Sequence, residues 1–133
     1  MHTQIYVNLP VADLERSKAF FTALGYGFNA EFTDDKAACL VLGENLYAML
    51  LRRDFFAGFT AKPVVDAHQG TEVLVCLNCS SREAMDTLVS KAVAHGGRAP
   101  RPLVDHGFMV QHGFEDPDGH IWELVVMQAP PAA

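Results

Sequence analysis

One carboxylate interrupts an otherwise apolar segment close to the end of this 133-residue chain. Glu123 lies among Ile121, Trp122, Leu124 and Val125. A buried carboxylate without a partner is costly, so such a group usually takes up a proton, pairs with a cation or binds a metal. Because side chains alternate along a strand, Glu123 shares a face with Ile121 and Val125. We therefore expect Glu123 to contact a metal or a substrate, or to pair with a cationic side chain.

A turn precedes this apolar segment. In Asp116-Pro117-Asp118-Gly119 the proline presets φ, the glycine accepts a positive φ, and the aspartates can accept hydrogen bonds from nearby backbone amides. Residues 107–114 on the other side of the turn also have the composition of a strand. The pattern predicts a β-hairpin.

Two histidines are predicted to lie close to Glu123. A hairpin register that pairs Phe114 with Ile121 places His112 opposite Glu123 and puts His106 on the same face. Such a set could bind a metal or act as acid and base, because histidine titrates near neutrality. The alternatives are that His112 and Glu123 form an ordinary cross-strand pair, and that His106 belongs to a solvated loop.

The composition limits the class of protein. Half of the residues are hydrophobic, which suffices for the core of one domain. The net charge of −6 without a basic cluster argues against nucleic acid or an anionic membrane as a main partner, which leaves small molecules or protein partners. The chain shows no signal peptide and no apolar run of about 20 residues. Together with the odd number of cysteines, this predicts a cytoplasmic protein.

The pattern of the first half recurs in the second half. The first half predicts a strand, a helix and three strands over about 4–52, and after a connector at 53–70 the same order returns over about 71–128. Cys76 and Cys79 fall on the second of these opening strands, where they are expected to be buried small hydrophobes. A repeat of this kind predicts an α+β fold in which each helix covers one sheet face and the paired sheets enclose a concavity.

The sequence resembles a known superfamily over nearly its whole length. Phe-x-Asp-Pro-Asp-Gly-His-x-x-Glu-Leu, at residues 114–124, and Val-x-Asp-Leu-x-Arg-Ser-x-x-Phe-Phe, at residues 11–21, are similar to motifs of the vicinal oxygen chelate (VOC) superfamily. This superfamily includes glyoxalase I, extradiol dioxygenases, fosfomycin resistance enzymes and bleomycin-binding proteins, and the chain resembles small bacterial lactoylglutathione lyase-like members. The resemblance implies a single VOC domain over 1–133, with paired βαβββ modules that form a cup-shaped mixed sheet.

In metal-using relatives, four positions converge on the cup. The resemblance places these positions at Tyr6, at Met49 or Leu50, at Leu74 and at Glu123. Only Glu123 is a usual ligand, and a divalent ion needs three or more nitrogen or oxygen ligands. The family's usual metal site is therefore expected to be largely lost, although a divalent metal held by another set, with His112, His106 and Tyr6, remains an alternative.

The resemblance leaves two functional hypotheses. The first is a lyase or isomerase in which Glu123, with His112 and Tyr6, moves a proton beside a carbonyl or enolate. The second is a non-catalytic protein of the bleomycin-resistance type that sequesters a ligand. In either case Tyr6, Asn8, Leu74 and His106 would contact the ligand, although Asn8 could equally make a structural hydrogen bond. The superfamily also implies a homodimer.

Overall fold

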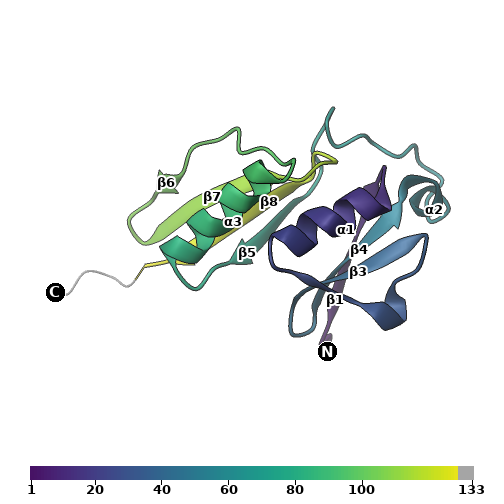
Figure 1. Cartoon of the computed structure of the whole chain (residues 1–133), viewed down its shortest axis with the longest axis horizontal. Helices are drawn as coiled ribbons and strands as arrows, with labels where there is room; N and C mark the ends of the chain where they lie inside the picture. Colours follow the sequence, from purple (N-terminus) through teal and green to yellow (C-terminus); the bar gives the residue numbers. More distant parts are fainter. Residues whose placement is uncertain (129–133) are drawn as a thin grey trace. The chain divides into compact units, whose positions relative to one another are not determined.

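The structure is a computed structural model and describes residues 1–128. The chain divides into two compact units, Met1–Asp66 and Ala67–Ala133. Of the domain predicted over 1–133, residues 129–133 lie outside the described part. Each unit contains a four-stranded mixed sheet and a helix that packs on it (Figure 1). The predicted α+β class with two βαβββ modules is confirmed.

The first unit has the strand order β1-β4-β3-β2. Its elements are β1 (Ile5–Val11), α1 (Leu14–Ala23), β2 (Gly27–Asn29), the 3-10 helix η1 (Ala30–Phe32), β3 (Ala37–Gly43), β4 (Leu46–Arg52) and α2 (Arg53–Ala57). β1 and β4 are parallel, whereas β3 is antiparallel to both β4 and β2.

Helix α1 begins where the sequence predicts it. Asp13 caps the helix, because its carboxylate accepts a hydrogen bond from the backbone N–H of Arg16 at 3.1 Å. The buried side of the helix consists of Leu14, Ser17, Phe20 and Phe21. This side packs on the sheet face that carries the buried residues Leu9, Val11, Ala38, Leu40, Ala48 and Leu50.

The second unit repeats the arrangement with the strand order β5-β8-β7-β6. Its elements are β5 (Leu74–Asn78), α3 (Arg82–Ala94), β6 (Val104–Asp105), β7 (Met109–Glu115) and β8 (Ile121–Met127). β5 is parallel to β8, and β7 is antiparallel to both β8 and β6. Since β1 and β5 open their modules and pair with the last strand of each, the two units have the same topology.

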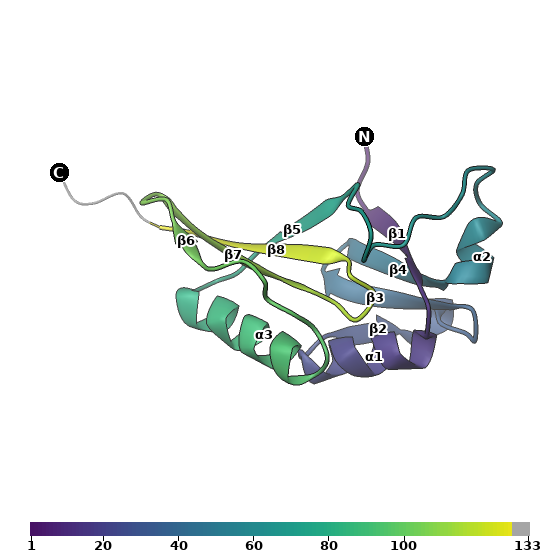
Figure 2. The same ribbon diagram turned by 90° about the horizontal axis from the view of Figure 1, so that it is seen from above.

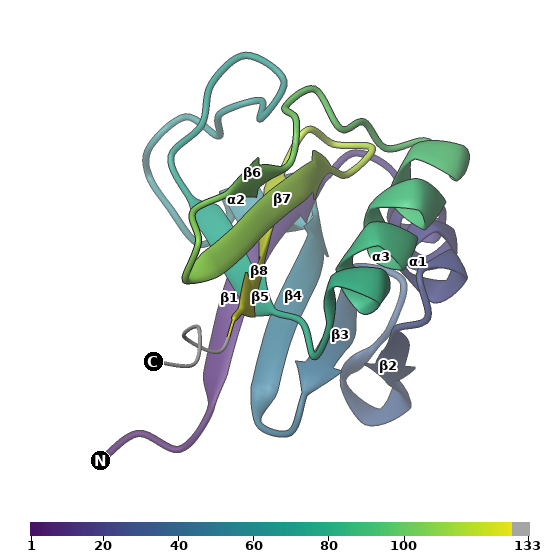
Figure 3. The ribbon, with the colours of Figure 1, turned by 90° about the vertical axis from the view of Figure 1, so that its left-hand side faces the viewer.

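Helix α3 covers one face of the second sheet (Figures 2 and 3). Ser81 caps the helix by accepting a hydrogen bond from the N–H of Ala84, and Met85, Val89 and Ala92 form its buried side. The sheet contributes Val110, Phe114, Trp122, Leu124 and Val126 to this core. The opposite face of the sheet, which carries Glu123, is not covered by α3.

Two predicted elements differ from the observed ones. The connector predicted at 53–70 begins with the short helix α2, whose first turn is stabilised by a two-bond contact between Arg52 and the carboxylate of Asp54. The strand predicted near 98–104 consists only of an isolated bridge from Arg98 to Glu115 and of β6. Pro100 and Pro102 lie between these two pairings, and proline has no N–H to donate to a strand ladder.

Among residues 1–128, every helix is too short or too polar to span a lipid bilayer.

Candidate ligand-binding site

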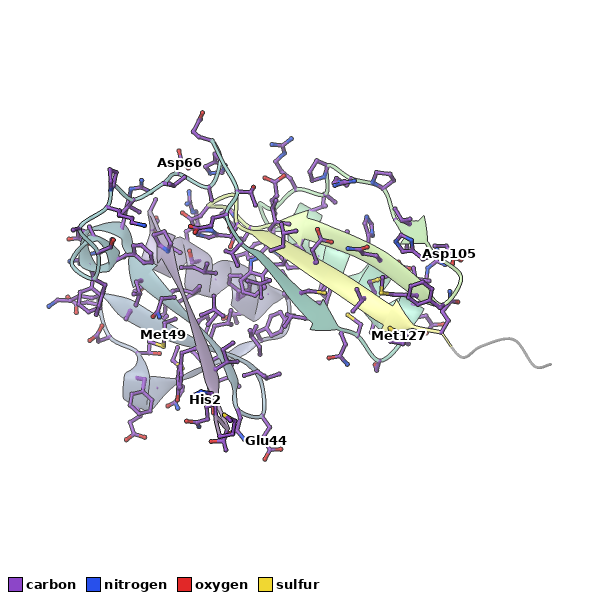
Figure 4. All side chains as sticks on the ribbon, turned by 180° about the vertical axis from the view of Figure 1, so that it is seen from behind. His2, Glu44, Met49, Asp66, Asp105 and Met127 are labelled. Carbon is purple, nitrogen blue, oxygen red and sulfur yellow. The ribbon has the colours of Figure 1, made fainter. Side chains whose placement is uncertain are left out.

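The site is built around Glu123 in the middle of β8. Along this strand the side chains alternate between buried Trp122, Leu124 and Val126 and partly exposed Ile121, Glu123 and Val125. The predicted face of Glu123 is therefore correct. In Figure 4 the second sheet is viewed from the side opposite to α3, and Met127 marks the end of β8.

Gln111 on β7 is the hydrogen-bond partner of Glu123. Its Nε2 donates to Glu123 Oε2 at 3.1 Å in a partly buried position. The two residues are diagonal neighbours on one sheet face, because Gln111 pairs with Val125 and Glu123 pairs with Gly113. Gln111 is not among the residues predicted from the sequence, because the alternation of β7 identifies it only when the hairpin register is known.

The glycine opposite Glu123 leaves room for the carboxylate. A Cβ atom at Gly113 would lie 2.8 Å from the carbonyl oxygen of Trp122 and 3.4 Å from Glu123 Oε2. Real Cβ atoms do not approach a backbone oxygen that closely, so a side chain at this position would displace either the strand or the carboxylate. A glycine inside a strand often marks such a close approach.

A hollow of about 290 Å³ lies beside these residues within the second unit. Its apolar wall includes Leu74, Ile121, Val104, Pro100 and Pro102, and its polar lining consists of Arg101, Gln111, His112, Glu115 and Glu123. Concave, mostly apolar sites with a few polar groups are typical of small-molecule binding. The segment 98–104 forms part of the wall because its prolines prevent it from joining the sheet as a full strand.

Glu123 has no cationic partner among the described residues. Its contacts are the amide of Gln111 and an electrostatic interaction with Cys76, which pairs with it across β5 and β8. Burial raises the pKa of the Cys76 thiol, and the negative charge of Glu123 raises it further. This thiol is therefore kept protonated beside the carboxylate. Cys76 is exposed and Cys79 is only partly buried, so the expectation that these two cysteines are buried is wrong for both.

The predicted position of His112 is wrong. In the observed hairpin Phe114 pairs with Trp122 and His112 pairs with Leu124, so His112 belongs to the sheet face opposite to Glu123. A shift of one residue in register moves every side chain to the other face. His112 Nε2 instead lies 3.2 Å from the carbonyl oxygen of Arg101, and its buried Nδ1 has no hydrogen-bond partner within the described residues.

The turn explains this shift. The carboxylate of buried Asp116 accepts hydrogen bonds from the N–H groups of Asp118 and His120, at 2.9 and 3.0 Å, and from Trp122 Nε1 at 3.0 Å. The backbone N–H of Asp116 donates to the carbonyl of His120, so the loop closes on Asp116 and His120. Glu115 then pairs with Ile121, which sets the register of the whole hairpin.

His106 reaches the Glu123 face indirectly. It lies in the turn between β6 and β7, where its backbone N–H donates to the carbonyl of Met109 at 2.8 Å. Its Nε2 lies 3.4 Å from Gln111 Oε1, and Gln111 in turn bonds to Glu123. His106 and Glu123 are thus joined through one amide rather than by direct contact.

The other predicted site residues lie on the sheet faces opposite to helices α1 and α3. Leu74 pairs with Ile121 on the Glu123 face and is 55% exposed. In the first unit, Tyr6 stacks on Tyr47, with ring centroids 4.8 Å apart, and Asn8 pairs with Met49. Met49, labelled in Figure 4, therefore shares the face of Tyr6 and Asn8, whereas Leu50 is fully buried on the other face. Of the two residues expected at the fourth-strand position, Met49 and not Leu50 thus shares the face of Tyr6.

These residues do not form the donor set that a divalent metal requires. Tyr6, Met49 and Leu74 supply one phenol, one thioether and one hydrocarbon side chain, and Glu123 supplies the only carboxylate of the four positions. A hard or borderline ion needs more nitrogen or oxygen ligands than this. Within residues 1–128, three or more His, Cys, Asp or Glu side chains do not gather in a way that could hold a metal ion. The metal of metal-using relatives does not fit this set.

Comparison with known proteins identifies the fold. The family model described as "Bleomycin resistance protein-like N-terminal" matches residues 3–43. A hypothetical protein from S. aureus is 27% identical, with a TM-score of 0.81 over 95% of each chain. A glyoxalase/bleomycin resistance protein/dioxygenase family enzyme from Burkholderia phytofirmans PsJN is 18% identical, with a TM-score of 0.76 over 92% of this chain and 97% of that chain.

TioX from Micromonospora sp. ML1 is 21% identical, with a TM-score of 0.62 over 98% of this chain and 100% of that chain. No curated protein matches the chain. The matches support the resemblance that the hairpin and first-helix motifs suggested.

Proposed function

We propose that this chain, which has the fold of the vicinal oxygen chelate superfamily, binds a small molecule against the open face of its second sheet. Glu123 accepts a hydrogen bond from the ligand, and the family's metal is not required. The observation that carries the proposal is the partly exposed carboxylate of Glu123, held by Gln111 beside a hollow with an apolar wall. A carboxylate without a cationic partner favours a ligand that brings a positive charge or a hydrogen-bond donor.

The charge of the protein supports a cationic ligand with an apolar body. The chain carries a net charge of −6, and Glu115 lines the hollow together with Glu123. Arg101, which also lines the hollow, forms no ion pair with either carboxylate. The match of residues 3–43 to a family model described as bleomycin resistance protein-like is consistent with a ligand-binding protein.

A thermal-shift screen followed by calorimetry tests the proposal. Cationic glycopeptides, aromatic amines and their neutral analogues are added to wild type, to Glu123→Gln and to Glu72→Gln. We expect an amine ligand to raise the melting temperature of wild type and of Glu72→Gln, because Glu72 is exposed and outside the hollow. Glu123→Gln should bind about tenfold more weakly, since hydrogen bonds to charged groups contribute about 1.5–3 kcal/mol.

The proposal would be abandoned if no compound stabilises wild type, or if both variants lose binding equally. Metal analysis of the purified protein provides an independent check. A stoichiometric divalent ion that is lost in Glu123→Gln would contradict a metal-free site.

A lyase or isomerase that uses Glu123 as a base is the second candidate. It is favoured by the accessible carboxylate beside a hollow of about 290 Å³, which leaves room for a small carbonyl compound. His112 also lines the hollow, but it pairs with Leu124 and not with Glu123. This candidate therefore assigns the proton transfer to Glu123 without a direct Glu123–His112 pair. Turnover of hemithioacetals or related carbonyl substrates by wild type, abolished in Glu123→Gln, would favour catalysis over sequestration.

We further propose that the protein acts as a homodimer in the cytoplasm. The support for a dimer is that large apolar side chains outside the hollow are exposed in the isolated chain, among them Val73, Val93 and Phe108. Light scattering at micromolar concentration measures the mass directly. A monomer at all concentrations would refute the dimer.

A further inference from the structure

We infer that Gln111 is a positioning residue, oriented by His106, that fixes Glu123 as a hydrogen-bond acceptor in the hollow. The inference rests on the proposed binding site and adds the reason why this carboxylate points where it does. It concerns a chain of two contacts, from His106 Nε2 to Gln111 Oε1 at 3.4 Å and from Gln111 Nε2 to Glu123 Oε2 at 3.1 Å.

The chemistry of the three side chains determines which group donates and which accepts in this hydrogen-bond relay. An ionised carboxylate only accepts hydrogen bonds, whereas a side-chain amide has one donating end and one accepting end. The NH₂ group of Gln111 therefore faces Glu123, and its Oε1 faces His106. His106 must then present an N–H at Nε2, because an unprotonated nitrogen there would face a carbonyl oxygen with no proton between them.

The backbone around His106 holds this first member of the hydrogen-bond relay in place. The N–H of Gly107 donates to Asp105 Oδ1 at 2.8 Å, and Gln128 Nε2 donates to Asp105 Oδ1 and to the carbonyl of Gly107, at 3.2 and 2.9 Å. Figure 4 labels Asp105 at this turn. Side-chain bonds thus hold the residues on both sides of His106, Asp105 and Gly107, which gives the imidazole a defined anchor although it is exposed.

The last member of this hydrogen-bond relay, Glu123, is held in place because Gly113 has no side chain. Glu123 Oε2 lies 3.4 Å from the position that a Cβ atom of residue 113 would occupy. The carboxylate therefore lies over the glycine and within reach of Gln111, with its charge uncompensated by any cation among the described residues. A neutral donor orients the carboxylate without cancelling its charge, so a ligand that supplies a positive donor gains the full attraction.

The side-chain amide signals of Gln111 in ligand-free protein test this relay directly. In ¹H–¹⁵N spectra of wild type, we expect one Gln111 amide proton to exchange with solvent about fivefold more slowly than those of Gln4, as one net hydrogen bond predicts. Gln4 is the internal control, because its contacts with Asn45 Oδ1 at 3.4 Å and with the hydroxyl of Tyr6 at 3.5 Å are long and exposed. The NH₂ group of Gln111, by contrast, donates to Glu123 at 3.1 Å in a partly buried position. Amide signals of Gln111 that match those of Gln4 would overturn the inference.

Variants separate a positioning role from a general structural one. His106→Phe should remove the protection of the Gln111 amide, and His106→Gln should restore it, because glutamine again offers an N–H donor. His95→Phe, at the exposed end of α3, is the matched control and should leave the Gln111 signals unchanged. Protection that survives in His106→Phe, or that is lost equally in His95→Phe, would contradict the role of His106.

Ligand binding provides a separate readout. Gln111→Met keeps the volume of the side chain but removes the donor, and we expect it to weaken binding of an amine ligand about threefold to tenfold without lowering the melting temperature of the free protein. Unchanged binding would contradict the positioning role of Gln111. If no ligand from the screen binds wild type, the proposed function fails, whereas the amide protection in ligand-free protein still decides the relay.

Discussion

The two modules carry different side chains at equivalent positions of the same sheet topology. Asn8 pairs with Met49 across β1 and β4, and Cys76 pairs with Glu123 across β5 and β8, so Met49 and Glu123 occupy corresponding positions. The residue opposite Met49 is buried Cys39, and the residue opposite Glu123 is Gly113. The first module fills this position with sulfur-containing side chains, whereas the second leaves a space in which a carboxylate lies.

This difference shows that the repeat preserved the scaffold without preserving the chemistry. Both helices are capped by a side chain that accepts a backbone N–H, and both bury one apolar side against their sheet. Covering one face of a sheet by a helix is required for a core, so the buried face is constrained in both modules. The opposite face is free to differ, and in the described residues its polar hydrogen-bonded hollow lies in the second module.

Removal of the buried carboxylate of Asp116, in the second hairpin (β7 and β8), should have the largest effect on stability. Asp116→Ala leaves the N–H groups of Asp118, His120 and Trp122 without their acceptor, and we expect the free energy of unfolding to fall by about 3 kcal/mol. Urea denaturation measures the change. The control is Asn45→Gly in the first hairpin (β3 and β4). This variant should lose little stability, because glycine adopts the positive φ of 63° more easily than asparagine does. Equal losses in the two hairpins would contradict the contrast between them.

A side chain at Gly113 should have the next largest effect. We expect Gly113→Ala to lower the free energy of unfolding by about 2 kcal/mol, because its Cβ would lie 2.8 Å from the carbonyl oxygen of Trp122. At the corresponding position of the first module, Cys39→Ala removes only a sulfur atom and should cost less. Calorimetric melting of both variants makes the comparison, and a stable Gly113→Ala protein would show that the strand can adjust.

Exchange of the side chain at the equivalent positions should separate binding from stability. Glu123→Met gives the second module the residue of the first, and we expect binding of an amine ligand to weaken about tenfold, or about 1.4 kcal/mol. The melting temperature should stay the same or rise, since an apolar side chain suits the surroundings of Ile121 and Val125. Met49→Leu is the control. Comparable loss of binding in both variants would place the ligand elsewhere.

The loop carboxylates should differ in their response to acid. Backbone hydrogen bonds from Lys36 and Ala37 hold the pKa of Asp34 below its ordinary value of 3.8. Because the unfolded chain then takes up a proton more readily, the stabilisation by Asp34 is present above 3.8 and is lost as the pH falls through the lowered value. The melting temperature of wild type should therefore be slightly higher than that of Asp34→Asn at neutral pH, and the two should be equal in strong acid. A difference in melting temperature that persists in strong acid would contradict a stabilising role of the charged Asp34 carboxylate.

Asp116 in the second hairpin behaves differently from Asp34. Burial raises the pKa of Asp116, and this effect opposes the attraction of His120 and the hydrogen bond from Trp122. Its stabilising role comes from three accepted hydrogen bonds in a buried turn rather than from a charge at the surface. The same residue type thus serves an exposed turn in the first module and the register of a hairpin in the second.

Much of the fold followed from the local pattern of the chain. The alternation in 4–11, the capping residues Asp13 and Ser81, and the apolar spacing of α3 each predicted an element that the structure contains. These signals are local, because a helix or strand requires only that its own residues repeat with the right period. The cup that the superfamily implies, and the homodimer, remain predictions.

The face of Glu123 was also determined by its own strand, and its partners were not. A register that pairs Phe114 with Ile121 makes His112 the neighbour of Glu123, whereas the structure pairs Phe114 with Trp122. The carboxylate of Asp116 closes the turn and thereby makes Glu115 pair with Ile121. That choice depends on three donors that converge only after the hairpin has formed, including the indole of Trp122.

The sequence by itself determined the secondary structure, the repeat and the presence of one carboxylate on an apolar strand. The tertiary structure alone decided that Gln111 rather than His112 contacts this carboxylate, and that Gly113 leaves the space for it. The physical reason is that alternation within a strand has a period of two, whereas pairing between strands depends on a turn whose hydrogen bonds are non-local. A shift of one residue in strand pairing therefore leaves the predicted fold correct but changes which residues lie next to Glu123.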